Sequence, residues 1–229
     1  MGCRGCAGSN VDTRLRFSGA KPLAAYFTVR ADTSSWDGSY DNRAMPRRLR
    51  IRWEDALDAQ GKPGLPHAHG VYVLAFRVPA PALYIGIAAD GGREPEGIPN
   101  RLRKHCVKAV GSHAGSGVTH PRRWRDFAMS RRDELRRLDR PDTLEDAVVM
   151  TGAVTGCPDV KGVYEYYESR LIRSMSVWSD ALRKQLVCAM FGDEHASPRC
   201  LNGNTGSSRG RQPEQAAIVF GSGEAIGLG

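Results

Sequence analysis

Two apolar segments joined by a short proline-containing turn place the tightest constraint on how this chain can fold. Residues 70–78 and 82–88 are rich in aliphatic and aromatic side chains, the composition of buried strands. Only Pro79, Ala80 and Pro81 lie between them, and so short a connection favours an antiparallel pair. The sequence therefore predicts a β-hairpin near the middle of the chain.

Periodic segments after the hairpin predict three helices and a third strand. A Gly- and Pro-rich loop over residues 90–99 comes first. Helical periodicity then follows at 100–110, 121–138 and 162–178, and an apolar run at 147–154 suits a strand. Strands together with helices predict a fold of the α/β (α+β) class.

The two ends of the chain carry weaker patterns, which we expect to elaborate this core. Residues 1–20, rich in Gly, Cys and Ser, predict a flexible arm, and residues 21–69 form an N-terminal extension. Within the extension, residues 49–53 alternate apolar and basic side chains, as in a strand with a solvated side or a ribbon that faces a polyanion. The Gly- and Ser-rich tail over 205–229 contains one strand-like run, residues 216–220.

The charge balance is basic, with a formal net charge of +8 and a pI of about 9.4. A basic surplus favours a polyanionic partner, because each neutralised phosphate releases condensed counterions. Solvated surface groups would account for the same composition. No run approaches the ~18 apolar residues that indicate a bilayer span, and no apolar stretch follows the first arginine as in a secretory leader. We therefore expect no membrane partner and a cytoplasmic location.

The six cysteines are weak candidates for metal binding. Only Cys3 and Cys6 have the spacing of metal ligands, and no second pair follows at the distance found in zinc fingers. A structural zinc at the N-terminus remains an alternative, but reduced thiols are the better account for a cytosolic protein.

Two tripeptides on the hairpin resemble the signature of a known family. The first segment opens with Gly70-Val71-Tyr72, and the second carries Tyr84-Ile85-Gly86, with eleven residues between the two tyrosines. This pair resembles the GIY-YIG endonuclease superfamily, in which Val replaces the middle Ile in some members. The resemblance implies a small three-stranded antiparallel sheet flanked by helices over residues 70–204, with N-terminal, internal and C-terminal elaborations.

An arginine and a histidine on the next helix fit the family's following motif. Arg101 and His105 are four residues apart and share one helical face, beside the apolar positions Leu102 and Cys106. Alone, the pair would read as a surface arginine beside a half-buried histidine. The Arg-x-x-x-His spacing resembles a branch of type II restriction enzymes. Arg103 is a competing candidate, but it points away from this edge.

A glutamate and an asparagine complete the set that the resemblance implies. Glu168 lies between apolar rows of the helix over 162–178, where a carboxylate requires a cation or hydrogen bonds, whereas Glu165 is exposed. A metal ion or a salt bridge would satisfy it. Asn202 follows a leucine, as the family's asparagine commonly does, after an inserted helix over 178–195. Asn204 is the alternative.

The resemblance implies a hydrolytic mechanism that uses Mg²⁺ or Mn²⁺. Glu168 would bind the metal, and Tyr72 with His105 would activate the attacking water. Arg101 would stabilise the transition state. Tyr84 would bind the phosphate or the water, and Asn202 would anchor the tyrosine or the backbone near the site.

Basic residues outside this set are candidates for binding double-stranded DNA. They lie on the first helix after the hairpin and on the one after that, where a solvated face is an equal alternative. These candidates are Arg103, Lys104, Arg122, Arg123, Arg125, Arg131 and Arg132.

The favoured interpretation is a type II restriction endonuclease that acts as a homodimer. The N-terminal extension would then bind DNA or the second subunit. We also expect a cognate DNA methyltransferase in the same system. The alternatives are a related nuclease of DNA repair or mobile elements, an inactive DNA-binding module, and a chance match on an unrelated α/β protein.

Overall fold

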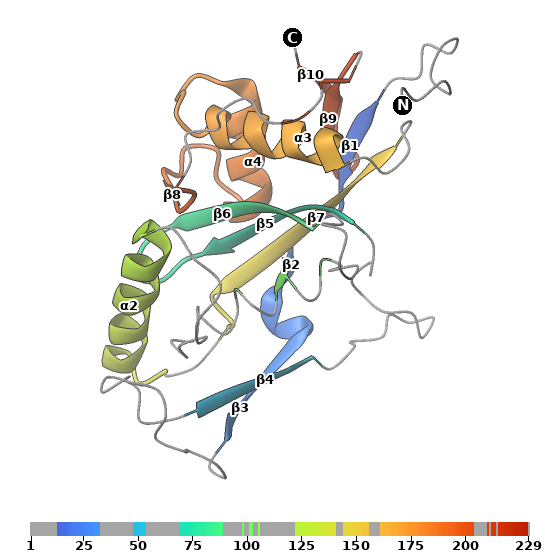
Figure 1. The fold of residues 1–229 in the computed structure, drawn as a ribbon. Helices are drawn as coiled ribbons and strands as arrows, with labels where there is room; N and C mark the ends of the chain where they lie inside the picture. Colours follow the sequence, from blue (N-terminus) through green and yellow to red (C-terminus); the bar gives the residue numbers. More distant parts are fainter. Residues whose placement is uncertain are drawn as a thin grey trace.

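The computed structural model is a mixed α/β protein built around one large curled sheet (Figure 1). It describes residues 13–32, 48–53, 69–88, 98, 101–102, 105, 122–140, 144–155, 161–203, 210, 212–213 and 215–228. The strands are β1 (Arg14–Phe17), β2 (Lys21–Pro22), β3 (Phe27–Asp32), β4 (Arg48–Trp53), β5 (Gly70–Phe76), β6 (Ala82–Ala88), β7 (Ala147–Thr155), β8 (Arg199–Cys200), β9 (Ala217–Phe220) and β10 (Ile226–Gly227). The helices are η1 (Leu23–Ala25), α2 (Arg122–Arg137), α3 (Lys161–Ser174) and α4 (Ala181–Phe191).

The large sheet has the strand order β10-β9-β1-β7-β5-β6-β8, with β2 also paired to β7. Pairing is antiparallel from β1 through β7 and β5 to β6, whereas β9 joins β1 and β8 joins β6 in parallel. The expected small three-stranded sheet is therefore wrong in extent, although β6, β5 and β7 pair antiparallel at the centre of the larger sheet. Strands of two to four residues complete the sheet, and such short strands leave little periodicity in a sequence. β3 and β4 form a separate two-stranded sheet.

The central hairpin is confirmed. β5 and β6 pair with Tyr72 opposite Gly86 and Leu74 opposite Tyr84. β5 ends at Phe76, two residues before the predicted end, and the bond from Val78 to the first proline of the turn is cis. Every residue of β5 is buried, as expected for a strand that is covered on both faces.

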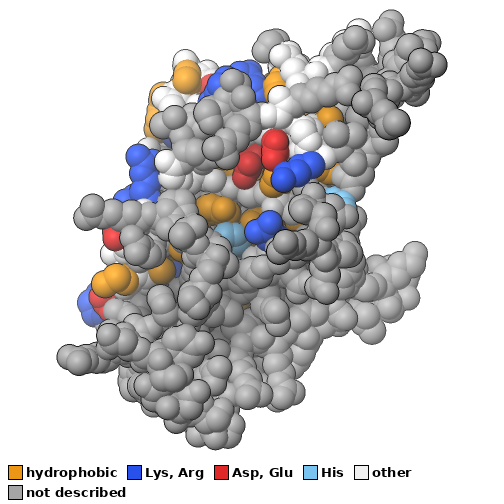
Figure 2. All heavy atoms as spheres, viewed as in Figure 1, with side chains coloured by type: hydrophobic (Ala, Val, Ile, Leu, Met, Phe, Trp, Pro, Cys, Tyr) orange, Lys and Arg blue, Asp and Glu red, His pale blue; other side chains and the backbone are white. Residues whose placement is uncertain are grey.

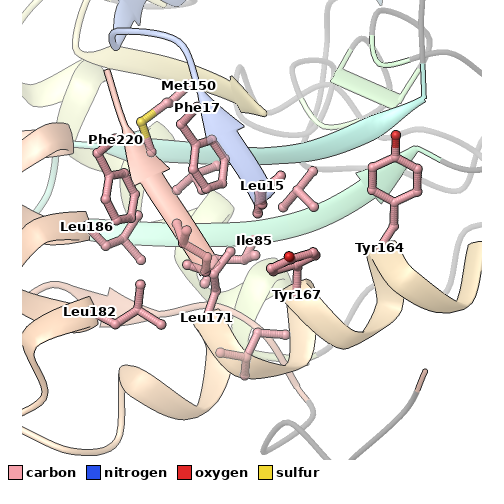
Figure 3. Close-up of a cluster of buried hydrophobic side chains, with 14 of the residues drawn as sticks. Leu15, Phe17, Ile85, Met150, Tyr164, Tyr167, Leu171, Leu182, Leu186 and Phe220 are labelled. Carbon is pink, nitrogen blue, oxygen red and sulfur yellow. The ribbon is translucent and has the colours of Figure 1, made fainter. Parts of the chain in front are cut away.

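One face of the sheet packs on α3 and α4 (Figures 1 and 3). Val71 and Val73 point to this face, where they join a buried cluster with Leu171 of α3 and Leu186 of α4. Tyr167 of α3 also donates its hydroxyl to the carbonyl of Thr13 at 2.7 Å, which ties the helix to the start of β1.

The opposite face of the hairpin packs on α2 and on the segment after the hairpin. Tyr72, Leu74 and Phe76 alternate with the residues of the first face, as the strand period requires. They share a buried cluster with Trp124 of α2 and Leu102.

The helices match the predictions with small shifts. α2 lies within the predicted range 121–138. α3 begins one residue before the predicted range 162–178 and ends at Ser174, and the inserted helix predicted over 178–195 is α4. The side chain of Asp180 caps α4 by accepting from the Leu182 amide at 2.8 Å. Of the helix expected over 100–110, the described residues Arg101, Leu102 and His105 have helical backbone.

Two terminal segments belong to the main sheet. The prediction of a flexible arm over residues 1–20 is wrong for the last part of this range, because Arg14–Phe17 forms β1 between β7 and β9. Near the other end, the predicted strand at 216–220 is confirmed as β9. The large sheet is thus not confined to residues 70–204.

In the part of the chain that the structure describes, no helix has the length and apolar character to cross a bilayer.

Candidate active site

Two tyrosines of the hairpin meet one histidine on the α2 side of the sheet. The hydroxyl of Tyr72 lies 2.7 Å from Nε2 of His105, within hydrogen-bond distance, and the bond is buried. The ring of Tyr84 lies 4.5 Å from the His105 ring and 6.3 Å from the Tyr72 ring, centroid to centroid. The hairpin register explains the meeting, because Gly86 stands opposite Tyr72 and Tyr84 is two residues away on the same face.

The glycines of both tripeptides are required by close approaches. A Cβ atom added to Gly86 would lie 2.5 Å from Cζ and from the hydroxyl of Tyr72, so the phenol ring leans over this glycine. A Cβ atom added to Gly70 would lie 2.5 Å from the carbonyl oxygen of Gly152, on the neighbouring strand β7. The two glycines therefore set the position of Tyr72 and the packing of β5 against β7.

An aromatic enclosure surrounds the histidine. His105 is 4% exposed, and the Trp124 indole lies 5.2 Å from its ring and 5.2 Å from the Tyr84 ring. Trp124 itself is fully buried. The sequence places Trp124 in the helix predicted over 121–138, but no local pattern indicates that its side chain meets the hairpin tyrosines.

Electrostatics place two further charged groups near Tyr84. The pKa of Tyr84 is raised to about 12: burial is the largest cause, the negative charge of Glu168 contributes to the rise, and the positive charge of Arg101 opposes it. Glu168 comes from α3 and is half-buried, as is Arg101. Opposite charges from two separate segments thus act on one phenol, which stays protonated at neutral pH.

Asn202 fixes the edge of β6 beside Tyr84. Its side-chain oxygen accepts from the Ile85 amide at 3.0 Å, and its side-chain nitrogen donates to the Ile85 carbonyl at 2.7 Å. β8 ends at Cys200, and the side-chain amide of Asn202 then makes the two hydrogen bonds that a residue of a neighbouring strand would make to Ile85. The position agrees with the expectation that Asn202 anchors the backbone near the site.

Cys200 and Arg123 lie at the same edge, and sequence analysis did not place either one in this site. Burial raises the pKa of the Cys200 thiol, although its contact with Asn202 and the charge of Arg123 act in the opposite direction. Arg123, an exposed residue of α2, donates to the Asn202 carbonyl at 3.5 Å. A cation from α2 therefore reaches the rim of the site.

Arg131 corrects the DNA-binding set. Its side chain is fully buried, forms two hydrogen bonds to the carboxylate of Asp146, and places its guanidinium carbon 5.5 Å from the Phe76 ring centroid. A guanidinium in this closed ion pair has no surface to offer a phosphate. The sequence pattern failed here because the helical position of Arg131 gave no sign of a carboxylate partner fifteen residues later.

Most of the remaining candidate residues lie outside the described part of the chain, wholly or by their side chains. Five lie outside the described residues or have side chains outside them: Arg103, Lys104, Arg122, Arg125 and Arg132. Cys3, Cys6 and Asn204 lie outside as well. Glu165 is partly exposed, and its carboxylate lies 3.8 Å from the ammonium of Lys161.

Acidic, basic and histidine side chains gather with hydrophobic ones around a hollow on the face shown in Figure 2. Within the described residues, no three His, Cys, Asp or Glu side chains form a metal-binding group.

No protein-family model, curated protein or solved structure matches this chain.

Proposed function

We propose that the protein is a metal-dependent endonuclease of GIY-YIG type that hydrolyses phosphodiester bonds in double-stranded DNA, and that it acts as a type II restriction enzyme. The observation that carries this proposal is the 2.7 Å contact between Tyr72 and His105, next to a Tyr84 that feels the charges of Glu168 and Arg101. These five residues come from three parts of the chain: the hairpin, the segment with Arg101 and His105, and α3.

Tyr72 and His105 together form the group that takes the proton of the attacking water. A phenol, with a reference pKa near 10, is a weak base at neutral pH unless a partner withdraws its proton. The His105 imidazole is within hydrogen-bond distance of the Tyr72 oxygen and can accept that proton, since histidine titrates near neutrality. The Tyr72 oxygen can then accept a proton from water.

Tyr84 and Arg101 act on the phosphate. Because the pKa of Tyr84 is raised to about 12, its hydroxyl stays protonated and serves as a hydrogen-bond donor to a phosphate oxygen. The guanidinium of Arg101 offsets negative charge that grows on the phosphorus oxygens in the transition state.

Glu168 supplies the carboxylate that a divalent cation requires. Its charge acts on the partly buried phenol of Tyr84, which supports the role of Glu168 as a metal ligand beside this tyrosine. Mg²⁺ commonly uses one or two protein carboxylates and completes its shell with water and phosphate, so a single glutamate fits. A bound Mg²⁺ or Mn²⁺ would stabilise charge on the non-bridging oxygens and on the leaving group.

The partners follow from this enzyme class. The net charge of +8 supports a polyanionic substrate. A homodimer would present one site to each strand of a palindromic target. A cognate DNA methyltransferase would protect the host DNA.

The direct test is plasmid cleavage by Glu168→Ala with Glu165→Ala as the matched control. Both substitutions remove a carboxylate from α3, but Glu165 is partly exposed and pairs with Lys161. We expect discrete fragments from the wild type and from Glu165→Ala in Mg²⁺, and none from Glu168→Ala or in EDTA. Equal cutting by Glu168→Ala would refute the metal assignment.

His105→Ala tests the proton path separately. Loss of a general base costs about 10²–10⁴-fold in rate, whereas DNA affinity measured in Ca²⁺ should change little. Loss of binding together with cleavage would instead assign His105 a structural role.

A further inference from the structure

A second hollow lies on the sheet away from the tyrosine pair. Its volume is about 370 Å³, and it opens over β1, β2 and β7. This is near the lower end of the ~300–1,000 Å³ of pockets that hold organic ligands. The lining residues include Arg16, Ser18, Lys21, His69, Thr151 and Thr155, with Tyr26, Ile98 and Val149 as apolar walls.

The polar part of this lining is suited to an anion. Arg16 and Lys21 are exposed, and within the described part of the chain neither of them forms an ion pair. Hydroxyls of Ser18 and Thr151 lie between β1 and β7, 3.4 Å apart. None of the described residues that line the hollow is Asp or Glu. A neutral ligand would leave both cations without a counter-charge.

The apolar walls indicate a ligand with more than an anionic group. Tyr26, Ile98 and Val149 are buried members of the cluster that also contains Tyr72. A phosphate alone would contact the cations and leave the rest of the hollow's surface, which is mostly apolar, uncovered. A nucleotide combines the two features, since its phosphate suits Arg and Lys and its base or sugar suits an apolar wall.

The hollow shares a sheet face with Tyr72. Thr151 stands directly opposite Tyr72 in the β5–β7 register, and Arg16 stands opposite Ala153, two residues further along β7. Directly paired residues, and residues two apart on one strand, point to the same face. Lys21 stands opposite Val149 and therefore also belongs to this face.

Two spacings give the separation from the site. β1 is two strands away from β5, or about 10 Å at the usual inter-strand distance. Ile98 lines the hollow and His105 touches Tyr72, and the seven positions of sequence between them limit their separation to about 25 Å. A DNA strand lying on the scissile site would reach this far within a few nucleotides.

We propose that this hollow binds one nucleotide of the DNA strand near the scissile phosphate, with the phosphate between Arg16 and Lys21 and the base or sugar against Tyr26 and Val149. The proposal rests on the proposed function. It assigns to β1 and β2 the task of holding the substrate strand in register with the tyrosine pair.

The first test uses deoxythymidine 3′,5′-bisphosphate, which carries the two phosphates that flank one nucleotide in a strand. We expect saturable shifts of the Ser18 and Thr151 amide resonances in the wild-type protein, weaker with thymidine. The Arg16→Ala/Lys21→Ala double variant should lose them. Lys184→Ala, which removes an exposed cation of α4 on the other sheet face, should keep them. Shifts that persist in the double variant, or their absence in the wild type, overturn the proposal.

The second test separates this proposal from the proposed function. Each phosphate neutralised contributes about 0.9 to the slope of log affinity against log salt, so the double variant should lose about 1 to 2 from the slope for plasmid DNA in Ca²⁺. A wild type that cuts DNA, with an unchanged slope in the double variant, overturns the nucleotide site alone. A wild type that neither binds nor cuts DNA refutes the nuclease.

Discussion

The position of the Tyr72 hydroxyl depends on the absence of a side chain at residue 86. The Tyr72 ring occupies the space where a Cβ atom would stand, and His105 contacts the hydroxyl at the end of that ring. The second tripeptide thus has two separate tasks: its tyrosine is the proposed hydrogen-bond donor to the phosphate, and its glycine provides the space for the ring of Tyr72.

Gly86→Ala should therefore impair cleavage more than folding. Overpacking of a buried site costs about 1–3 kcal/mol, and a catalytic group misplaced by about 1 Å can lose 10²-fold in rate. Gly227→Ala, in β10 at the far edge of the sheet, is the control, because a Cβ atom there also meets nothing within 4 Å. Cleavage rates and urea unfolding of both variants measure the two effects. Wild-type cleavage by Gly86→Ala would contradict the packing argument.

The raised pKa of Tyr84, about 12, makes stability depend on pH in the alkaline range. In the unfolded chain a tyrosine loses its proton near pH 10. The free energy of unfolding is therefore unaffected below pH 10 and falls as pH rises from 10 to 12, by about 2–3 kcal/mol in total for this group. Tyr84→Phe should lack this part of the decrease. Urea unfolding at pH 9, 10 and 11 measures the difference between the two proteins, and a difference that stays constant with pH would contradict the assignment.

Among single residues, the sequence indicated the proposed site residues far better than the side chains that pack around them. Tyr72, Tyr84 and His105 stand in motifs with fixed spacing, so a resemblance could identify them. Trp124 and the ion pair of Arg131 depend on which helix face meets the sheet, and helical periodicity indicates only that some face is buried.

At the level of elements, Asn202 connects a two-residue strand to the hairpin. β8 ends at Cys200, and the Asn202 side chain then bonds to both backbone groups of Ile85. Beyond the end of β8, the Asn202 side chain therefore supplies the polar contacts to the β6 backbone at Ile85, next to Tyr84.

Asn202→Ala should weaken this edge. The change leaves the Ile85 N–H and C=O without their side-chain partner, at about 1–3 kcal/mol for each buried group. Hydrogen exchange at the Ile85 amide should accelerate, and urea unfolding should show the loss of stability. Cys200→Ser is the neighbouring control, since the thiol contacts Asn202 only at 3.6 Å. Unchanged exchange at Ile85 would contradict the role of Asn202.

Long or strongly patterned elements could be predicted, and short ones could not. The hairpin, β7, α2, α3 and α4 each show several repeats of an apolar period or a clear breaker. β1 and β2 have four and two residues, and their pairing partners lie more than 120 positions away. The mixed α/β class was predictable, but the eight-stranded sheet was not.

For the whole molecule, the two ends of the chain complete one core. β1 lies between β7 and β9, and the rings of Phe17 and Phe220 stack at 5.3 Å. Ile218 is fully buried and Leu228 is 6% exposed in the cluster under α3 and α4 (Figure 3).

Removal of residues 216–229 should therefore abolish folding, although the proposed catalytic residues all precede this segment. Burial of Ile218, Phe220 and Leu228 contributes about 1.5–3 kcal/mol each, a large part of the roughly 5–15 kcal/mol that stabilises a typical domain. Near-UV circular dichroism and thermal unfolding measure the loss. Ile218→Ala, which keeps the chain length, should remain folded but lose about 2–5 kcal/mol. A cooperative unfolding transition in the truncated protein would contradict this account.

The parallel pairing of β1 with β9 also sets an order of events during biosynthesis. β1 leaves the ribosome well before its parallel partner Ala217–Phe220, because Arg14 pairs with Ala217. At about 5–20 residues per second, translation of the intervening chain takes on the order of 10–40 s. The nascent polypeptide holds β1 without its parallel neighbour throughout that time. The sheet that carries the tyrosine pair is thus completed only after β9 has left the ribosome.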